Sequence, residues 1–331
     1  MDVALEVGAP ALRAVAAVDL LYVVGNDRER GVEAVGLARD AEAMLVALGD
    51  PPLLRARLMS HRASALAHGS SPRPEEAVQL HVEALAILRG TLGDSHPDVI
   101  VELGNLGAAL SQTDRFEEAR AQLEDALARA IATWGEGHPR TARLRGTLGR
   151  ALAARGELAA AREQLERSLR AREAALGDDH DEVASARYNL AMVMREQGDH
   201  AEAIEQLTRG LRTRERARGP DDPGHAEWLQ RIGISELARG EPRRAQSPLH
   251  RALELSERWG ASRDRFGNLR VSLARAYAPD DPAKARVLAE LARREWLDDP
   301  EELARIDALL EELRAAEATR DAPEPSPRGP G

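Results

Sequence analysis

A glycine-centred turn recurs along this chain at an interval of 42 residues, and this repeat constrains the fold more than any other feature. The turn reads Leu-Gly-Asp-Ser-His-Pro at 92–97 and returns as Trp-Gly-Glu-Gly-His-Pro at 134–139. Its glycines are Gly93, Gly135, Gly177 and Gly219, with looser copies at Gly49 and Gly260. Self-similarity at a period of about 20 to 50 residues is typical of proteins that stack one supersecondary unit many times. The repeat therefore predicts one continuous solenoid for the 331 residues, in place of about two globular domains.

Each repeat holds two stretches of helical periodicity separated by a short break. The first stretch has a small residue at an aligned position, namely Gly107, Gly149, Ala191 and Gly233. The second stretch has a leucine at an aligned position, namely Leu123, Leu165, Leu207 and Leu249. Because two antiparallel helices approach closely only where a side chain is small, we expect each small residue to face the leucine of its own repeat.

Residue types also predict the turns. Pro97 and Pro139 stand where a first helix begins, and the missing N–H of proline costs nothing in the first turn of a helix. The break between the two helices of a repeat holds Asp114, Gly156, Gly198 or Gly240. We expect a left-handed backbone at these four positions, because Gly and Asn or Asp tolerate it best.

The predicted organisation is a solenoid over residues 1–317 and a Pro-rich tail over 318–331 that we expect to be disordered. The solenoid comprises about seven helix pairs and a capping helix at 300–317. The pairs span about 10–48, 52–90, 97–133, 139–175, 181–217, 223–259 and 262–297. In the first pair, the apolar run Val15–Val24 contains Asp19 and is too short to cross a bilayer, so we expect a buried helix.

Composition excludes several classes of protein. The chain has no cysteine, which rules out disulfides, thiolate catalysis and Cys-based metal sites. Its net charge of −10 argues against general affinity for nucleic acid. The first ten residues contain no basic residue, so the positive start of a signal peptide is missing. We therefore expect a cytoplasmic protein without membrane association.

A search for catalytic motifs assigns no catalytic residue. The sequence contains no phosphate-binding glycine loop, no H-E-x-x-H and no kinase H-R-D loop, so we expect no enzyme, no cofactor and no small-molecule substrate. The acidic run Asp178–Glu182 surrounds His180 and could be imagined as a metal site. It occupies the same inter-repeat turn as Asp94–Pro97, however, so we expect helix capping and a negative first turn instead.

The repeat unit resembles the tetratricopeptide repeat. The 42-residue form with its Leu-Gly-Asp-x-His-Pro turn is similar to the repeats of kinesin light chains and their bacterial relatives. It is also similar to the C-terminal repeat regions of bacterial, myxobacterial-type serine/threonine kinases. The resemblance covers about residues 10–297. It implies an all-α, right-handed superhelical solenoid that binds a peptide or protein in a concave groove lined by the first helix of each pair.

The resemblance also implies which side chains face the groove. Asn105 and Asn189 match an asparagine that stands just before the Leu-Gly or Leu-Ala pair in kinesin light chains, where its amide can hydrogen-bond a bound peptide backbone. The groove positions are Arg57, His61, Asn105, Arg143, Arg150, Asn189, Arg195, Arg231, Asn268 and Arg275. Arginine forks and amides favour carboxylates, phosphates and extended backbones. The alternative interpretation is a solvated helix face in an arginine-rich chain.

These observations favour a non-catalytic scaffold that binds a partner peptide or protein segment, acidic or phosphorylated, in the groove. Two alternatives stay open. One is a regulatory or sensor module of a serine/threonine kinase signalling system that lacks the kinase domain. The other is a homo-oligomerisation or accessory module, in which the groove packs against another copy of the chain.

Overall fold

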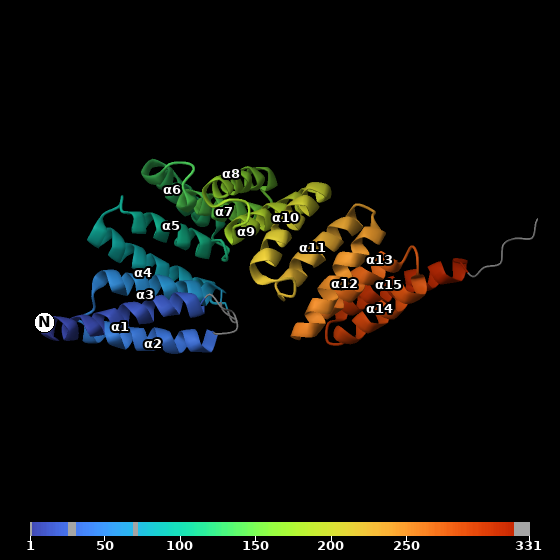
Figure 1. The fold of residues 1–331 in the computed structure, drawn as a ribbon, viewed down its shortest axis with the longest axis horizontal. Helices are drawn as coiled ribbons and strands as arrows, with labels where there is room; N and C mark the ends of the chain where they lie inside the picture. The colour runs from blue at the N-terminus through green and yellow to red at the C-terminus, as the bar shows by residue number, and fades with distance from the viewer. Residues whose placement is uncertain (1, 26–30, 69–71, 321–331) are drawn as a thin grey trace, which may run out of the picture. The chain divides into compact units, whose positions relative to one another are not determined.

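The computed structural model describes residues 2–25, 31–68 and 72–320, and these residues form fifteen α-helices and no strand (Figure 1). The helices are α1 Asp2–Gly25, α2 Gly31–Ala47, α3 Pro52–His68, α4 Pro74–Leu92, α5 Pro97–Leu110, α6 Phe116–Trp134, α7 Pro139–Ala154, α8 Leu158–Leu176, α9 Asp181–Gln197, α10 His200–Arg218, α11 His225–Ala238, α12 Pro242–Trp259, α13 Arg263–Tyr277, α14 Pro282–Glu295 and α15 Pro300–Arg320. In chain order they make seven helix pairs followed by one further helix. The predicted all-α fold class is confirmed.

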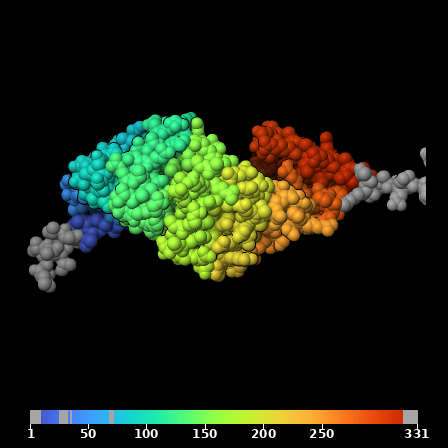
Figure 2. All heavy atoms as spheres, turned by 90° about the horizontal axis from the view of Figure 1, so that it is seen from above, coloured from blue at the N-terminus to red at the C-terminus, as the bar shows by residue number. Residues whose placement is uncertain are grey.

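The chain divides into two compact units, Met1–Ala175 and Leu176–Gly331. In the first unit, α3 packs on α4 and α5 packs on α6, while α1, α3, α5 and α7 contact one another in series. In Figure 2 the atoms of this unit follow one another in chain order from blue to green, as expected for a stack in which each repeat contacts its neighbours. In the second unit, α9, α11 and α13 pair with α10, α12 and α14 in the same way.

The last helix, α15, covers the end of the second unit. Ile306 and Leu310 of α15 are buried and join one apolar cluster with Ala285 and Ala289 of α14. The helix continues to Arg320, three residues into the segment expected to be a tail, and residues 321–331 of that predicted tail lie outside the described residues.

The predicted contact between small residues and leucines is confirmed. A Cβ atom placed on Gly107 would lie 2.5 Å from Cγ of Leu123, and one placed on Gly149 would lie 2.7 Å from Cγ of Leu165. Gly233 meets Leu249 in the same way. These distances are too short for a side chain, so the absent side chain is what lets the two helices of a repeat approach.

The left-handed turns are confirmed at three of the four predicted positions. Gly156, Gly198 and Gly240 have φ values of +77°, +87° and +76°. The prediction for Asp114 is wrong, because Asp50 is the one non-glycine residue of the described ranges with positive φ. The hydroxyl of the preceding Thr113 closes that turn instead, since it donates to the Leu110 carbonyl (2.8 Å) and accepts from the Arg115 N–H (3.2 Å).

The helix that contains the run Val15–Val24 is buried only on one face, so the prediction of a buried helix is partly wrong. Val18, Leu21 and Val24 are buried against α2 and α3, but Leu20 and Val23 are 45% and 64% exposed. Leu12 belongs to the same exposed stripe, since these residues follow one another at helical spacing. No described element covers this stripe, because α1 is the first helix of its stack.

Candidate functional site

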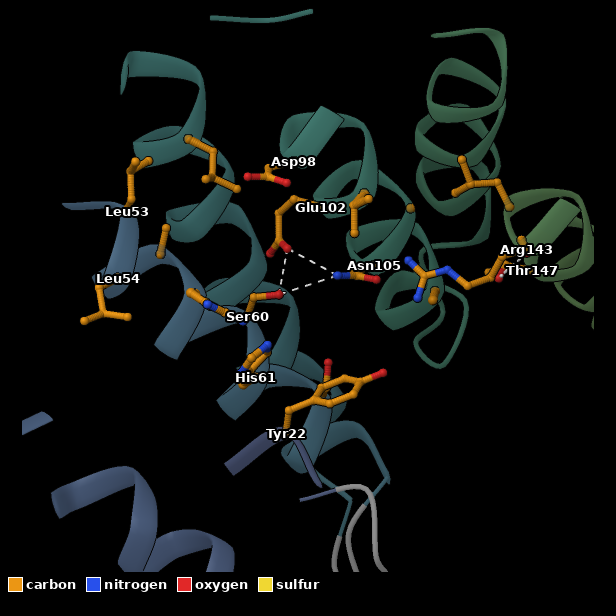
Figure 3. Close-up of a pocket in the computed structure, with 18 of the residues that line it drawn as sticks. Tyr22, Leu53, Leu54, Ser60, His61, Asp98, Glu102, Asn105, Arg143 and Thr147 are labelled. Atoms are coloured by element: carbon orange, nitrogen blue, oxygen red, sulfur yellow. Dashed lines mark hydrogen bonds between the residues drawn. The ribbon is translucent and has the colours of Figure 1, made fainter. Parts of the chain in front are cut away.

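A hollow of about 860 Å³ opens in the first unit on the side of the first helices. Its wall is built by residues of α1, α3, α5 and α7, together with Leu88 of α4. All five groove residues predicted for this unit line the hollow, and they are Arg57, His61, Asn105, Arg143 and Arg150. Figure 3 labels His61, Asn105 and Arg143 among them. The stack thus brings together side chains from three repeats that lie far apart in the sequence.

Two of these side chains already interact with other residues of the protein. Arg57 forms an ion pair of 2.6 Å with Asp19 of α1. The Nδ1 atom of His61 lies 2.8 Å from the Val18 carbonyl, and burial lowers the pKa of the imidazole. A neutral imidazole can donate one hydrogen bond from Nδ1, so His61 joins α3 to α1. Both residues help to fix the wall of the hollow.

Asn105 is oriented by a buried carboxylate at the floor of the hollow. Its Nδ2 amide donates to Oε2 of Glu102 at 3.3 Å, and Glu102 also accepts from the Ser60 hydroxyl at 2.7 Å (Figure 3). The other oxygen of Glu102 lies 2.7 Å from Nδ1 of His81, and both residues are only 2% exposed. Because the amide nitrogen faces the carboxylate, the Oδ1 atom of Asn105 is left as the hydrogen-bond acceptor.

Glu102 is not among the residues predicted for the groove, although the sequence contains a signal for it. Glu102 occupies a repeat position that is apolar and buried in the neighbouring repeats, where it is Leu58, Leu144, Ala186 and Trp228. An ionisable residue at an apolar repeat position indicates a buried polar network, since a lone buried carboxylate would be too costly.

Arg143 and Arg150 supply the positive charge of the hollow. They stand two turns apart on α7, so they share one face of that helix. Both side chains are exposed, and no carboxylate of the described residues forms an ion pair with either. Loss of hydration among the surrounding helices lowers the pKa of Arg150, although its side chain still reaches solvent. In Figure 3 the Arg143 guanidinium points toward Asn105.

The second unit has a hollow of its own, of about 960 Å³, lined by residues of α11, α13 and α15. Three predicted groove residues, Arg231, Asn268 and Arg275, line it. Asn189 and Arg195 lie on α9 and are not part of this lining. Arg195 nevertheless contacts α11, because its Nε atom donates to the Ser235 hydroxyl at 3.0 Å.

The histidines of the inter-repeat turns are helix caps, as the sequence predicted. The Nδ1 atoms of His96, His138 and His180 each accept the backbone N–H two residues later at 3.1 Å. In the run Asp178–Glu182, Asp178 pairs with Arg187 at 3.0 Å and with Arg209 at 3.2 Å. The acidic side chains of this turn therefore hold arginines of the same unit.

Comparison with known families identifies the class of protein. The profile described as Tetratricopeptide repeat matches residues 54–132, 103–174, 140–216 and 182–258, which together make up more than half of the chain. The chain belongs to the tetratricopeptide repeat family. No curated protein sequence matches it.

Solved structures with similar folds include proteins of different roles. One is a Podosopora anserina protein assigned as a kinesin light chain with nearly identical TPR-like repeats, to which the chain is 21% identical. The match covers 69% of this chain and 99% of that one, with a TM-score of 0.50. For the apo form of RapI the identity is 14%, the coverage 93% and 87%, and the TM-score 0.66. For the apo form of the quorum sensor NprR from B. thuringiensis the identity is 14%, the coverage of this chain and that chain is 86% and 85%, and the TM-score is 0.55. At these identities the similarity concerns the fold.

A membrane-spanning helix is absent from the described part of the chain, since none of its helices is both long and apolar enough.

Proposed function

We propose that this protein is a non-catalytic scaffold that binds an acidic segment of a partner protein in the hollow of the first unit. The tetratricopeptide fold supports a role in protein interaction. The observation that supports an acidic ligand is the pair Arg143 and Arg150. Both guanidinium groups are exposed and line the hollow, and neither forms an ion pair with a carboxylate of the described residues.

The groups around this pair suit an extended peptide backbone. Asn105 offers its Oδ1 atom to a backbone N–H, because its amide nitrogen is engaged by Glu102. Arg143 and Arg150 donate to acidic side chains or to backbone carbonyls of the same segment. Leu53, Leu54 and Val101 add apolar surface to the lining. The hollow combines an apolar wall with a few oriented polar groups, as peptide and ligand sites usually do.

Affinity capture from a native lysate tests this proposal. The bait is run as the wild type and as Arg143→Glu/Arg150→Glu, and captured proteins are quantified by mass spectrometry. We expect partners with acidic segments to be enriched by the wild type and lost by the variant. Arg39→Glu/Arg170→Glu is the matched control, since it makes the same charge change on exposed arginines of second helices outside the hollow.

Equal capture by all three baits, after their helicity and thermal stability are shown to match, would mean that the basic lining is only a solvated face. Loss of capture by the control alone would place binding on the opposite side of the repeats.

Self-association is a second candidate function, favoured by the exposed apolar stripe of Leu12, Leu20 and Val23 on α1. A solution mass that rises with concentration, and falls to the monomer in Leu20→Asp, would support it. The kinase-associated role and the cytoplasmic location stay predictions from the sequence.

A further inference from the structure

Two arginines meet in the seam between α9 and α11 of the second unit. On α11, Glu227, Arg231 and Ser235 follow one another at single turns of the helix. On α9, Tyr188 and Arg195 stand two turns apart and contact the two ends of that row. The Tyr188 hydroxyl donates to Glu227 at 2.5 Å, and Nε of Arg195 donates to the Ser235 hydroxyl at 3.0 Å. Arg231 therefore lies between the two contacts.

Neither arginine is neutralised by a close carboxylate. The one ion pair that the described residues give Arg231 is with Glu227 at 3.7 Å, and that carboxylate already accepts the Tyr188 hydroxyl. Arg195 has no ion pair in the described part of the chain, and its Nη1 atom meets only the Met192 sulfur at 3.6 Å. Burial and then the charge of Arg231 lower the pKa of Arg195, so the two cations repel each other in a partly dehydrated seam.

Part of the hydrogen-bonding capacity of this pair is unused. Nε of Arg231 is buried without an acceptor among the described residues, while 38% of its side chain remains exposed. Two adjacent guanidinium groups that repel each other and have few strong acceptors are stabilised by one oxyanion that accepts from both. An anion of charge near −2 offsets the repulsion better than a single carboxylate does.

We propose that Arg195 and Arg231 form a subsite for the phosphoryl group of a phosphorylated side chain in a partner segment. Arg231 also lines the hollow of the second unit, so the residues that flank the phosphorylated one enter that hollow. There they meet the apolar side chains Ile234 and Val271 and the polar side chains Asn268 and Arg275. This inference rests on the proposed peptide binding by the first helices, but it uses other residues in the other unit.

The test measures fluorescence anisotropy with labelled degenerate peptides whose central residue is phosphoserine, glutamate or serine. For the wild type we expect the phosphoserine pool to bind at least about tenfold more tightly than the glutamate pool, because only the phosphoryl group engages both forks. Arg195→Gln/Arg231→Gln should abolish that preference. Arg195→Lys/Arg231→Lys should keep part of it, since the charge is retained and the planar fork is lost.

Arg212→Gln/Arg294→Gln is the matched control, with two exposed arginines of α10 and α14 that have no ion pair among the described residues, and it should bind like the wild type. Equal affinity for the phosphoserine and glutamate pools, or a preference that survives Arg195→Gln/Arg231→Gln, would overturn the proposal. Arg143→Glu/Arg150→Glu separates the two proposals. Loss of the phosphoserine preference in that variant would assign the phosphoryl group to the hollow of the first unit and refute the subsite.

Discussion

At the scale of single residues, the buried carboxylate of Glu102 determines what the hollow of the first unit can offer to a ligand. Glu102 accepts hydrogen bonds from Ser60 and Asn105 and contacts His81, so both of its carboxylate oxygens already have partners inside the protein. The consequence for binding is indirect, because Glu102 turns the Asn105 oxygen toward the ligand. Glu102 is thus a positioning residue.

Replacing Glu102 alone should cost more stability than replacing it together with His81. Glu102→Leu leaves His81 and the Ser60 hydroxyl without their acceptor, and we expect the free energy of unfolding to fall by about 2 kcal/mol. In His81→Leu/Glu102→Leu both buried partners are apolar, and part of that loss should be recovered. Urea unfolding followed by circular dichroism measures both values. A double variant that is no more stable than Glu102→Leu would contradict this account of the network.

At the scale of helices, close approach within a repeat depends on one missing side chain. Gly107 faces Leu123 and Gly149 faces Leu165, in each case without room for a Cβ atom. Ala191 is fully buried at the same position of the next repeat, beside the buried Leu207, so the spacing can widen by one methyl group. A larger side chain should exceed what the helix pair can accommodate.

Gly107→Val should lower the free energy of unfolding by about 1 to 3 kcal/mol, because the added methyl groups overlap Leu123. Gly90→Val is the matched control, since nothing lies within 4 Å of a Cβ at Gly90 of α4. The control should be neutral or slightly stabilising, because valine has a higher helix propensity than glycine. Equal destabilisation by both substitutions would mean that helix packing is not the reason for the small residue.

The inter-repeat turn of the second unit is held to α9 by an arginine that is almost fully buried. The Arg187 side chain is 2% exposed and reaches Asp178 in the turn, just as Arg145 reaches Glu136 one repeat earlier. The charge of Arg187 holds the pKa of Asp178 below its usual range. The pKa of Asp178 is lower in the folded state than in the unfolded state. Its contribution to stability is therefore present above the unfolded-state pKa and is lost as the pH falls through the folded-state pKa.

We therefore expect the difference in unfolding free energy between the wild type and Asp178→Asn to be largest near neutral pH. It should shrink below about pH 4, as the carboxylate of the wild type becomes protonated. Chemical unfolding at a series of pH values measures it, with Asp264→Asn as a control that removes the same charge without an ion pair seen in the described residues. A difference between wild type and Asp178→Asn that grows toward acid would contradict the assignment.

At the scale of the whole chain, the 42-residue period was sufficient to predict an all-α stack of helix pairs. Period, small residues and turn glycines all follow from local backbone and packing constraints, which a single sequence displays directly. Asp114 was mispredicted because a neighbouring threonine closes its turn by a hydrogen bond. The exposed stripe on α1 was missed because hydrophobicity alone does not show which face of a helix has a neighbour.

The candidate site was less predictable, because its chemistry depends on which groups pair across repeats. The resemblance to tetratricopeptide repeats implied that Arg57, Asn105 and Arg143 face one groove, and the structure lines one hollow with all three. Position could not show that Asp19 neutralises Arg57, or that Glu102 fixes the amide of Asn105. Whether these side chains bind a peptide stays a prediction.

The most direct test of the central claim is the affinity of short synthetic peptides for the hollow of the first unit. Fluorescence anisotropy would compare a degenerate pool rich in Asp and Glu with a pool of equal length rich in Lys and Arg. We predict that the wild type binds the acidic pool and that Arg143→Glu/Arg150→Glu weakens this binding at least about tenfold, which is about 1.4 kcal/mol, while Arg39→Glu/Arg170→Glu does not. An acidic pool that binds the wild type and Arg143→Glu/Arg150→Glu equally well would contradict the account.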